Sequence, residues 1–357
     1  MAEERTRSLN IAVIPGDGIG PELVESALEV LRAVAELDSF TLATTEEPGG
    51  AGHYRETGQA LAPEGMERLR AVDAILKGPV GLPDVRRPDG TEAGLLGGIM
   101  RIGLDTFANV RPIRLFPGVA AATRHRPDQI DYVIVRESTE GLYLSRGAGV
   151  ATPHAACDQL LVTRYGATRV IRFAFELARS RGDWGSKAPH VTCVDKSNVL
   201  RSFALFREVF NEVAHAYPDV EVDYLYADAA GHELVVHPDR FDVLVMENFL
   251  GDVLSDVGAA TVGGLGMCGS GNFGAGAAYF EPIHGSAPTI ARQERANPVS
   301  QILSAAMLLD HVGRPQSSNR IRTAVASAFE QGAVVLDENG SPRCGTASAT
   351  RAILARL

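Results

Sequence analysis

The sequence predicts an α/β protein with two domains, and three observations support that prediction. A chain of 357 residues is long for a single hydrophobic core, so two domains are the natural expectation. Residues 9–14 form an apolar run of strand length, and a glycine-rich turn and a helical pattern follow it. Charged groups stand at the carboxyl ends of later apolar strands, where open α/β sheets place their ligands: Arg136, Lys196, Asp228 and Asp252.

Composition and charge narrow the class of protein. The apolar share of 45% is ordinary for a globular chain, and the net charge of −10 argues against a nucleic-acid partner. The 4 cysteines form no C-x-x-C pair, which predicts a reducing compartment, the cytoplasm, and argues against a thiolate metal site. The N-terminal stretch mixes acids and bases without an apolar core, so we expect no secretory signal.

One span, residues 257–280, carries no charge and is long enough to cross a bilayer. It is crowded with glycines, which weaken regular structure. We therefore interpret this span as tight loops packed inside a soluble protein, and we expect no membrane partner.

The first part of the chain opens with a strand at 9–14 and a turn at 15–20. The turn has the spacing G-x-G-x-G, which differs from the dinucleotide fingerprint and fits either a phosphate seat or a plain tight turn. Pro21 and Glu22 favour the start of a helix that runs to about residue 37. We then expect a strand near 40–45, a glycine turn at 49–52, a helix near 63–70, a strand at 72–76, a long loop over 78–98, a helix at 99–107 and a turn at 107–112.

The second part of the chain again alternates apolar strands with helical patterns. We expect strands at 131–136, 190–195, 220–226 and 241–246, and helices at 159–180, 199–216, 298–311 and 318–331. No internal repeat and no low-complexity tail is visible.

Two carboxylates follow the strand predicted at 241–246. Asp252 and Asp256 are four residues apart, so on a helix they project from one face. Such a pair suits a hard cation such as Mg²⁺ or Mn²⁺, which takes oxygen ligands. The alternative is that both aspartates merely favour the positive end of a helix.

Other side chains have chemistry that would suit the same site. Three arginines have the planar fork that pairs with carboxylates, although any one of them is more often a surface charge: Arg101, Arg111 and Arg136. Lys196 and Tyr143 can transfer protons if burial and neighbours shift their pKa values. The alternatives are an ion pair for Lys196, for example with Asp195, and a satisfied core hydroxyl for Tyr143.

Taken together, these motifs resemble those of the isocitrate/3-isopropylmalate dehydrogenase family of β-decarboxylating dehydrogenases. The resemblance covers about residues 9–355, and the motifs occur in the family's order. The matching stretches are IPGDGIGPE (14–22), FANVRPIRLFPG (107–118), VIVRESTEGLY (133–143), VTCVDKSNVLR (191–201), YADAA (226–230), ENFLGDVLSD (247–256), EPIHGSAPTI (281–290) and ANP (296–298).

The resemblance implies roles for the substrate and metal residues. The three arginines match those that bind the carboxylates of a malate-type substrate: Arg101, Arg111 and Arg136. Mg²⁺ or Mn²⁺ would be bound by Asp252 and Asp256 of one subunit. The neighbouring subunit would contribute Asp228 and Lys196, so the resemblance implies a homodimer with shared active sites.

The resemblance also implies the proton transfers and the cofactor site. Lys196 matches the general base on the substrate hydroxyl, and Tyr143 matches the acid that protonates carbon after CO₂ leaves. Asn198 matches a residue near the nicotinamide. The loop that binds the adenosine corresponds to His284, Gly285, Ser286, Ala287 and Asn297.

The fold implied by the resemblance has two α/β domains around a largely parallel sheet, with the chain crossing twice between them. Residues 1–106 plus 263–357 would bind the nucleotide. Residues 107–262 would bind substrate and metal and would form the dimer, with an interlocking arm near 145–160.

The chain departs from the family's pattern in the adenosine loop. NAD-linked members carry an aspartate after HGSAP, and NADP-linked members often carry Lys-Tyr, whereas this chain has Thr289-Ile290. A threonine hydroxyl makes only part of a carboxylate's contacts with ribose. Arg292 would be able to contact a 2′-phosphate. We expect NAD with weak discrimination, so NADP stays open.

A second departure concerns the segment that selects the substituent on carbon 3. Counting back from Arg101 puts Gly97 and Gly98 there, which gives room without a polar partner. A two-residue insertion would instead let Leu95 and Leu96 line an apolar pocket. Both registers favour an apolar or large substituent, whereas Glu140 is commoner in isocitrate, homoisocitrate and tartrate/malate types.

The sequence thus predicts a metal-dependent oxidative decarboxylation of a 3-substituted (2R)-malate, isopropylmalate-like, to a 2-oxo acid with NAD(P) reduction. The alternatives are a D-malate/tartrate or a homoisocitrate/isocitrate type of decarboxylating dehydrogenase, or a non-catalytic regulatory subunit of the family.

Overall fold

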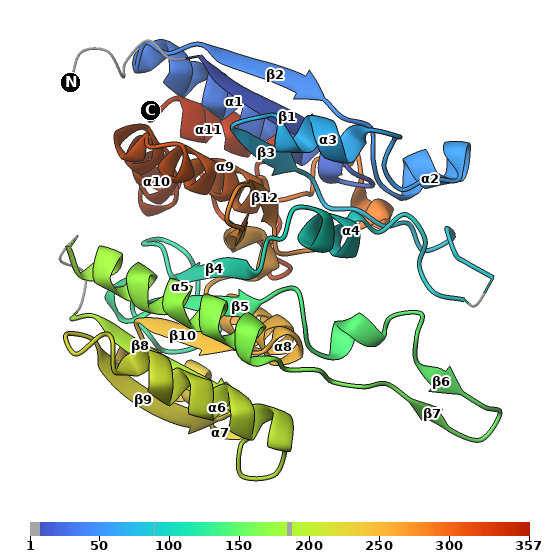
Figure 1. The fold of residues 1–357 in the computed structure, drawn as a ribbon. Coiled ribbons are helices and arrows are strands. Elements are labelled where there is room, and N and C mark those ends of the chain that lie inside the picture. The colour runs from blue at the N-terminus through green and yellow to red at the C-terminus, as the bar shows by residue number, and fades with distance from the viewer. Residues whose placement is uncertain (1–7, 89, 184–187) are drawn as a thin grey trace. The chain divides into compact units, whose positions relative to one another are not determined.

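A computed structural model describes residues 8–88, 90–183 and 188–357 (Figure 1). Residues 1–7, where we expected no secretory signal, lie outside the described residues, as do 89 and 184–187. The chain forms two compact units. The first comprises Met1–Asp105, Phe116–Ala122 and Val262–Leu357, and the second comprises Thr106–Leu115 and Thr123–Thr261. The short stretch 116–122 thus belongs to the first unit.

The strands of the first unit lie in the order β2-β1-β3-β12-β11. Neighbouring strands are parallel except for β11, which is antiparallel to β12. The buried apolar residues of β1 and β3 form the centre of this sheet. The strand bounds are Leu9–Ile14 for β1, Leu42–Glu46 for β2, Ala74–Lys77 for β3, Gly269–Phe273 for β11 and Ala278–Pro282 for β12.

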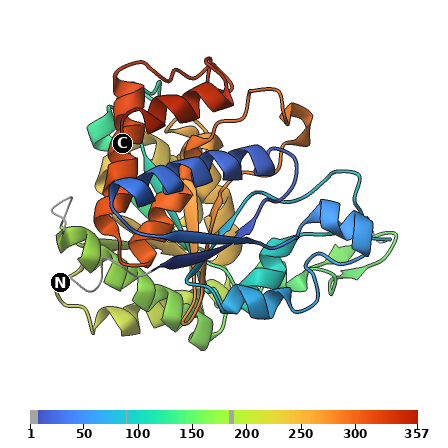
Figure 2. The ribbon, with the colours of Figure 1, turned by 90° about the horizontal axis from the view of Figure 1, so that it is seen from above.

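The longer helices of the first unit pack against one another beside its strands. In Figure 2 the blue helix α1 runs next to the orange and red helices α9, α10 and α11, with which it is in contact. Their bounds are Gly20–Leu37 for α1, Val299–His311 for α9, Pro315–Glu330 for α10 and Thr346–Leu354 for α11. Shorter helices complete the unit: α2 (Ala51–Thr57), α3 (Gly65–Arg70) and α4 (Leu96–Gly103).

The strands of the second unit lie in the order β4-β5-β10-β8-β9, with β4 antiparallel and the others parallel. Helices α5 and α6 cover one face of these strands, and α7 and α8 cover the other (Figure 1). The strands are β4 (Ala108–Arg114), β5 (Asp131–Glu137), β8 (His190–Asp195), β9 (Glu221–Tyr226) and β10 (Val243–Met246). The helices are α5 (Arg164–Asp183), α6 (Arg201–Ala214), α7 (Ala227–Val236) and α8 (Asn248–Ala260).

A small hairpin extends from the second unit in Figure 1. It consists of β6 (Val150–Ala151) and β7 (Ala156–Cys157), which pair antiparallel, and its residues are exposed. This hairpin lies within the segment 145–160 that the sequence marked as an arm.

The predicted α/β fold with a largely parallel sheet is confirmed, but residues 257–280 differ from the expectation of tight loops. Helix α8 ends in this span, and β11 and most of β12 lie in it. Gly269 allows close packing of α9 on β11: a Cβ there would lie 2.7 Å from the backbone nitrogen of Ser304. None of the described helices is long and apolar enough to cross a membrane.

Two further differences lie next to the functional residues. Helix α4 begins at Leu96 rather than 99 and ends at Gly103, and β4 occupies the region where we expected a turn. Pro112 suggested that turn because proline has no N–H to donate to a ladder. In the structure Pro112 lies opposite Val133 in the antiparallel pair of β4 and β5.

Candidate active site

The predicted strand and helix at 241–256 are present and position both aspartates. β10 ends at Met246, and the carboxylate of Glu247 accepts a hydrogen bond from the backbone N–H of Leu250 at 3.2 Å. Glu247 therefore caps the start of α8. Asp252 and Asp256 lie one turn apart on this helix, as the spacing predicts.

Three of the predicted site residues converge on the carboxylate of Asp252. The guanidinium of Arg111 donates to its Oδ1 at 3.3 Å, and the guanidinium of Arg136 donates to the same oxygen. The hydroxyl of Tyr143 donates to Oδ2 at 2.7 Å. Both arginines are buried, with 5% of Arg111 and 2% of Arg136 exposed. They are therefore buried, hydrogen-bonded charges rather than surface charges.

Neutral neighbours orient Arg111. Its Nε donates to Oδ1 of Asn109 at 2.6 Å, and its Nη1 donates to Oγ of Ser255 at 2.6 Å. Asn109 lies on β4 beside Arg111, whereas Ser255 lies on α8 one turn beyond Asp252. A strand and a helix thus hold this guanidinium from two directions.

Close approach of α8 to β5 orients Arg136. A Cβ on Gly251 would lie 2.6 Å from Cβ and Cγ of Arg136, so a larger residue at 251 would push the helix away from the strand. Oδ1 of Asn248 accepts from Nε and Nη2 of Arg136 at 3.0 and 2.8 Å.

Tyr143 is a surface residue. The alternative interpretation, in which its hydroxyl is a hydrogen-bonded group of the core, is therefore wrong. Its side chain is 43% exposed. Its ring packs edge-on against Phe249 with 6.0 Å between centroids, and the guanidinium of Arg136 lies 5.6 Å from the ring centre. An exposed hydroxyl next to two buried cations suits proton transfer to a bound ligand.

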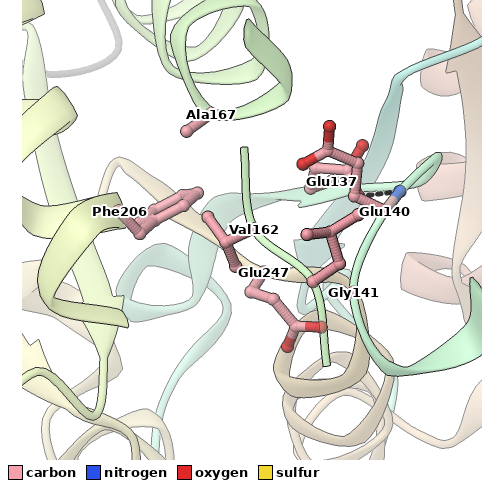
Figure 3. A pocket seen from close by; sticks show the side chains of 8 residues that line it. Glu137, Glu140, Gly141, Val162, Ala167, Phe206 and Glu247 are labelled. Carbon is pink, nitrogen blue, oxygen red and sulfur yellow. Dashed lines mark hydrogen bonds between the residues drawn. The ribbon is translucent and has the colours of Figure 1, made fainter. Parts of the chain in front are cut away.

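Buried glutamates support the turn that carries Tyr143. Glu137, at the end of β5, accepts from the backbone N–H groups of Thr139 and Glu140 at 2.7 and 2.8 Å. Figure 3 shows the contact between Glu137 and Glu140 beside a small pocket that these two residues and Glu247 line. Burial raises the pKa values of Glu137 and Glu247, while backbone N–H groups oppose that shift.

Lys196 pairs with Asp228 rather than with Asp195. The Nζ of Lys196 lies 2.5 Å from Oδ1 of Asp228, and this contact lowers the pKa of Asp228. Asp195 is fully buried and accepts from Arg207 at 2.6 Å and from the backbone N–H of Ser197 at 2.8 Å. Asp195 therefore fixes the turn after β8, on which Lys196 and the exposed Asn198 lie.

The three predicted metal ligands do not gather within one chain. Among the residues that the structure describes, no three His, Cys, Asp or Glu side chains form a group that could hold a metal. Asp252 and Asp256 supply two adjacent carboxylates, which suit part of a hard-cation site. Partial burial raises the pKa of Asp256, Arg111 opposes that shift, and Asp252 adds to it. The donor set fits a divalent cation provided that another carboxylate completes it.

The candidate substituent residues lie at the start of α4 in the first unit. Leu96 is fully buried and packs in the core with Met100, whereas Leu95 is half-buried. A Cβ on Gly97 or Gly98 would meet nothing within 4 Å. Arg101 follows one turn later on the same helix and is also half-buried.

The candidate cofactor residues also belong to the first unit, except Asn198, which lies in the second. The glycine turn contacts the loop 284–289: the N–H of Ile19 donates to the carbonyl of Ser286 at 2.8 Å, and a Cβ on Gly18 would lie 2.0 Å from that oxygen. Asp17 accepts from the N–H groups of Ala51 and Gly52 and of Gly81, each at 2.8 Å, and so ties neighbouring loops together.

The residues of the loop itself differ in exposure. Gly285, Ala287 and Thr289 are exposed, whereas Ser286 and Asn297 are buried. Burial lowers the pKa of His284, which favours the neutral form of its imidazole. The N–H of Arg292 donates to the carboxylate of Glu22 at 3.3 Å.

Sequence reasoning missed the polar residues that hold the arginines. Asn248 and Ser255 share the face of α8 that carries Asp252, at spacings of four and three residues. That helical spacing was readable from the sequence. Asn109 gives no such helical spacing, because it lies on the strand β4 beside Arg111.

Two buried arginines, a tyrosine and the two aspartates of α8 thus lie together in an α/β fold, an arrangement typical of an enzyme site. The sequence model of the isocitrate/isopropylmalate dehydrogenase family matches residues 10–353. The chain belongs to this family.

Individual relatives are similar in sequence to this chain over most of their length. A 3-isopropylmalate dehydrogenase of Clavibacter sepedonicus is 45% identical over 90% of this chain and 91% of its own. One of Corynebacterium glutamicum is 46% identical over 89% and 92%. The crystal structure of an isocitrate dehydrogenase from Methylococcus capsulatus is similar with a TM-score of 0.86 and 37% identity, covering 98% of this chain and 99% of that one.

Proposed function

We propose that this enzyme catalyses the metal-dependent oxidative decarboxylation of a 3-substituted (2R)-malate, isopropylmalate-like, to a 2-oxo acid with reduction of NAD. The observation that carries the proposal is the convergence of Arg111, Arg136 and Tyr143 on Asp252. Family membership and the 3-isopropylmalate dehydrogenases at 45% and 46% identity support the reaction type.

The chain's own residues would divide the reaction as follows. Arg111 and Arg136, joined by Arg101, bind the carboxylates of the substrate through charge-assisted hydrogen bonds. Lys196, as the neutral amine, takes the proton of the 2-hydroxyl as hydride leaves carbon 2 for NAD. The resulting 3-carboxy-2-oxo acid loses CO₂, and Tyr143 then donates a proton to carbon 3.

We assign Mg²⁺ or Mn²⁺ to Asp252 and Asp256, with Asp228 as the further carboxylate. When bound, the cation would polarise the substrate's oxygens and stabilise negative charge there. The closeness of the two carboxylates supports this assignment: burial is the main cause of the raised pKa of Asp256, Asp252 adds to it, and a nearby cation would offset both effects.

The first unit is the proposed nucleotide-binding domain, and the second is the proposed substrate, metal and dimerisation domain. The adenosine would bind at His284, Gly285, Ser286, Ala287, Thr289 and Asn297, with Asn198 near the nicotinamide. NAD is the proposed cofactor, with weak discrimination against NADP because Thr289 stands where a carboxylate would contact ribose. Thr289→Asp should raise the NAD/NADP ratio of kcat/KM, and an unchanged ratio would contradict this assignment.

The substituent on carbon 3 would lie beside Arg101. Residues three and four positions before an arginine share its face of a helix, and here these are Gly97 and Gly98. The open space at both glycines and the burial of Leu96 favour them, with Leu95, over Leu96 as the lining of that space. A bulky apolar substituent suits such a surface.

We further propose a homodimer in which Asp228 and Lys196 complete the partner's site. Exposed apolar residues on α7 and α8 support an interface there: Val235 (39%), Val236 (41%), Phe249 (38%) and Val253 (49%). Their exposure in one chain is typical of a surface that a partner covers. The hairpin of β6 and β7 is the proposed arm. The free cysteines support a reducing compartment, the cytoplasm.

The deciding experiment measures NAD and NADP reduction with Mg²⁺ or Mn²⁺ and then with chelator. The substrate panel contains D-malate, tartrate, isocitrate, homoisocitrate, isopropylmalate and malates with larger substituents. Chelator-sensitive turnover, greatest with an apolar substituent, is the expected result. Preference for D-malate, tartrate or the isocitrates would favour the alternative substrate types. No turnover by a folded, metal-loaded dimer would favour a regulatory subunit.

A further inference from the structure

We propose that Asn248 is a positioning residue that holds Arg136 and the turn of Tyr143 in their working arrangement. This inference rests on the proposed function, since it assigns Arg136 to the substrate carboxylate. Asn248 is the first residue of α8 and is 2% exposed. Its amide contacts two different elements of the site, and neither contact is explained by the fold of α8 alone.

The two contacts fix the orientation of the amide. Oδ1 accepts from Nε and Nη2 of Arg136 at 3.0 and 2.8 Å, and Nδ2 donates to the carbonyl of Glu140 at 2.7 Å. A guanidinium only donates and a carbonyl only accepts, so the opposite orientation would lose both contacts. One buried side chain thus ties the end of β5 to the turn that leads to Tyr143.

Helix α8 uses two successive turns to hold the guanidinium. Asn248 and Asp252 are four residues apart on one face, and both accept hydrogen bonds from Arg136. Gly251 between them permits the close approach of helix and strand. Arg136 is therefore held from two sides, so its direction does not depend on Asp252 alone.

The amide's lack of charge matters for ligand binding. Asp252 already brings one carboxylate to Arg136. A second carboxylate at position 248 would offset the positive charge that attracts the substrate, and its oxygen would face the carbonyl of Glu140. A neutral acceptor orients the guanidinium without reducing its attraction for an anion.

A double-mutant cycle with Arg136 tests the inference. Asn248→Ala should lower kcat/KM by about 10- to 100-fold, mainly through a higher KM, because a small misplacement of a binding group is costly. In an Arg136→Met background the same substitution should raise KM by less than about twofold, since the guanidinium that it orients is gone. Equal losses in both backgrounds would reduce Asn248 to a general structural residue and overturn the proposal.

Two comparisons separate positioning from folding and from the proposed reaction. Asn272→Ala is a matched control, because Asn272 is also fully buried and donates to Glu281 at 3.2 Å; it should lower Tm without changing KM. A crystal structure of Asn248→Ala needs no turnover and should show the Arg136 guanidinium displaced. An unmoved guanidinium would contradict the inference, whereas an inactive wild type with a displaced guanidinium in the variant would contradict only the proposed function.

Discussion

The hydroxyl of Tyr143 donates a hydrogen bond of 2.7 Å to Asp252, so the proposed acid and a proposed metal ligand are in direct contact. The same carboxylate accepts from Arg111 and Arg136. A carboxylate that binds a cation has fewer lone pairs left for hydrogen bonds. Metal loading should therefore release the Tyr143 hydroxyl towards the substrate, which couples the proton donor to the metal.

Replacing Tyr143 separates proton transfer from metal binding. Tyr143→Phe should lower kcat by about 100- to 10,000-fold, the usual range for loss of a general acid. The rise in Tm on adding Mg²⁺ should remain, because Asp252 and Asp256 are intact. Tyr165→Phe is a suitable control, since Tyr165 is 71% exposed and lies on α5. Loss of the Mg²⁺ effect on Tm in Tyr143→Phe would mean that Tyr143 organises the metal site instead.

The raised pKa of Asp256 predicts how pH affects the metal-free enzyme. A carboxyl whose pKa is higher in the folded state binds its proton more tightly there, so its ionisation opposes folding. Its stabilising effect is complete below the unfolded pKa of about 4 and is lost as pH rises through the folded pKa. Asp256→Asn should therefore raise the Tm of metal-free enzyme slightly at pH 7 and leave it unchanged at pH 3.

With added Mg²⁺, wild type should have a higher Tm than Asp256→Asn at pH 7. Ligands that bind only the folded state raise Tm, so wild type should gain more than Asp256→Asn. Thermal scans of both proteins at pH 3, 5 and 7, with Mg²⁺ or with chelator, make this comparison. An Asp256→Asn protein that is less stable than wild type at pH 7 without metal would mean that the Arg111 contact outweighs the burial of the carboxylate.

The glycines before Arg101 give a prediction that links stability to specificity. Gly98 lies on α4, and a Cβ there would meet nothing within 4 Å. Gly98→Ala should therefore stabilise the protein by about 0.5 kcal/mol through its better helix propensity. Gly98→Leu should lower kcat/KM for isopropylmalate and larger analogues and spare D-malate, which has no 3-substituent. Gly276→Leu is the control, because Gly276 is equally open and exposed.

The sequence predicted the elements whose signals are local. The strand and helix at 241–256 followed from apolar length and from the spacing of Asp252 and Asp256, and both are present. The contacts that orient the arginines join distant positions: Asn248 and Arg136 are separated by 112 residues. No local periodicity in the sequence indicates that these two residues are in contact. The contact forms because β5 and β10 are neighbours in the sheet and α8 begins directly after β10.

The burial of individual leucines could not be predicted from the sequence either. Leu95 and Leu96 are chemically identical in the sequence, yet only Leu96 joins the core with Met100. Its side of α4 depends on where the helix begins, and helix boundaries are weakly encoded. The sequence therefore left two registers open before Arg101, and the start of α4 at Leu96 supports the one with Gly97 and Gly98 on the open face.

The proposed sharing of sites between subunits makes a final prediction. Within one chain Lys196 pairs with Asp228, and these residues join Asp252 in no metal-binding group among the described residues. If sites are shared, Lys196→Ala and Asp252→Asn homodimers should each be inactive. A mixed dimer should contain one site with both residues intact. After equal mixing and refolding, half of the dimers are mixed and each has one of two sites, so activity should return to about a quarter of wild type.

The control for that experiment is the double variant. Lys196→Ala with Asp252→Asn in one chain, mixed with wild type, gives mixed dimers in which each site lacks one residue. Refolded equally, this mixture should retain only the activity of its wild-type homodimers, about a quarter, with nothing from the mixed dimers. If the sites were instead complete within one chain, the two single variants would stay inactive on mixing, and the double variant with wild type would retain about half of the activity. Shared sites therefore give activity when the two single variants are mixed. Sites complete within one chain give none there, but give more activity when the double variant is mixed with wild type.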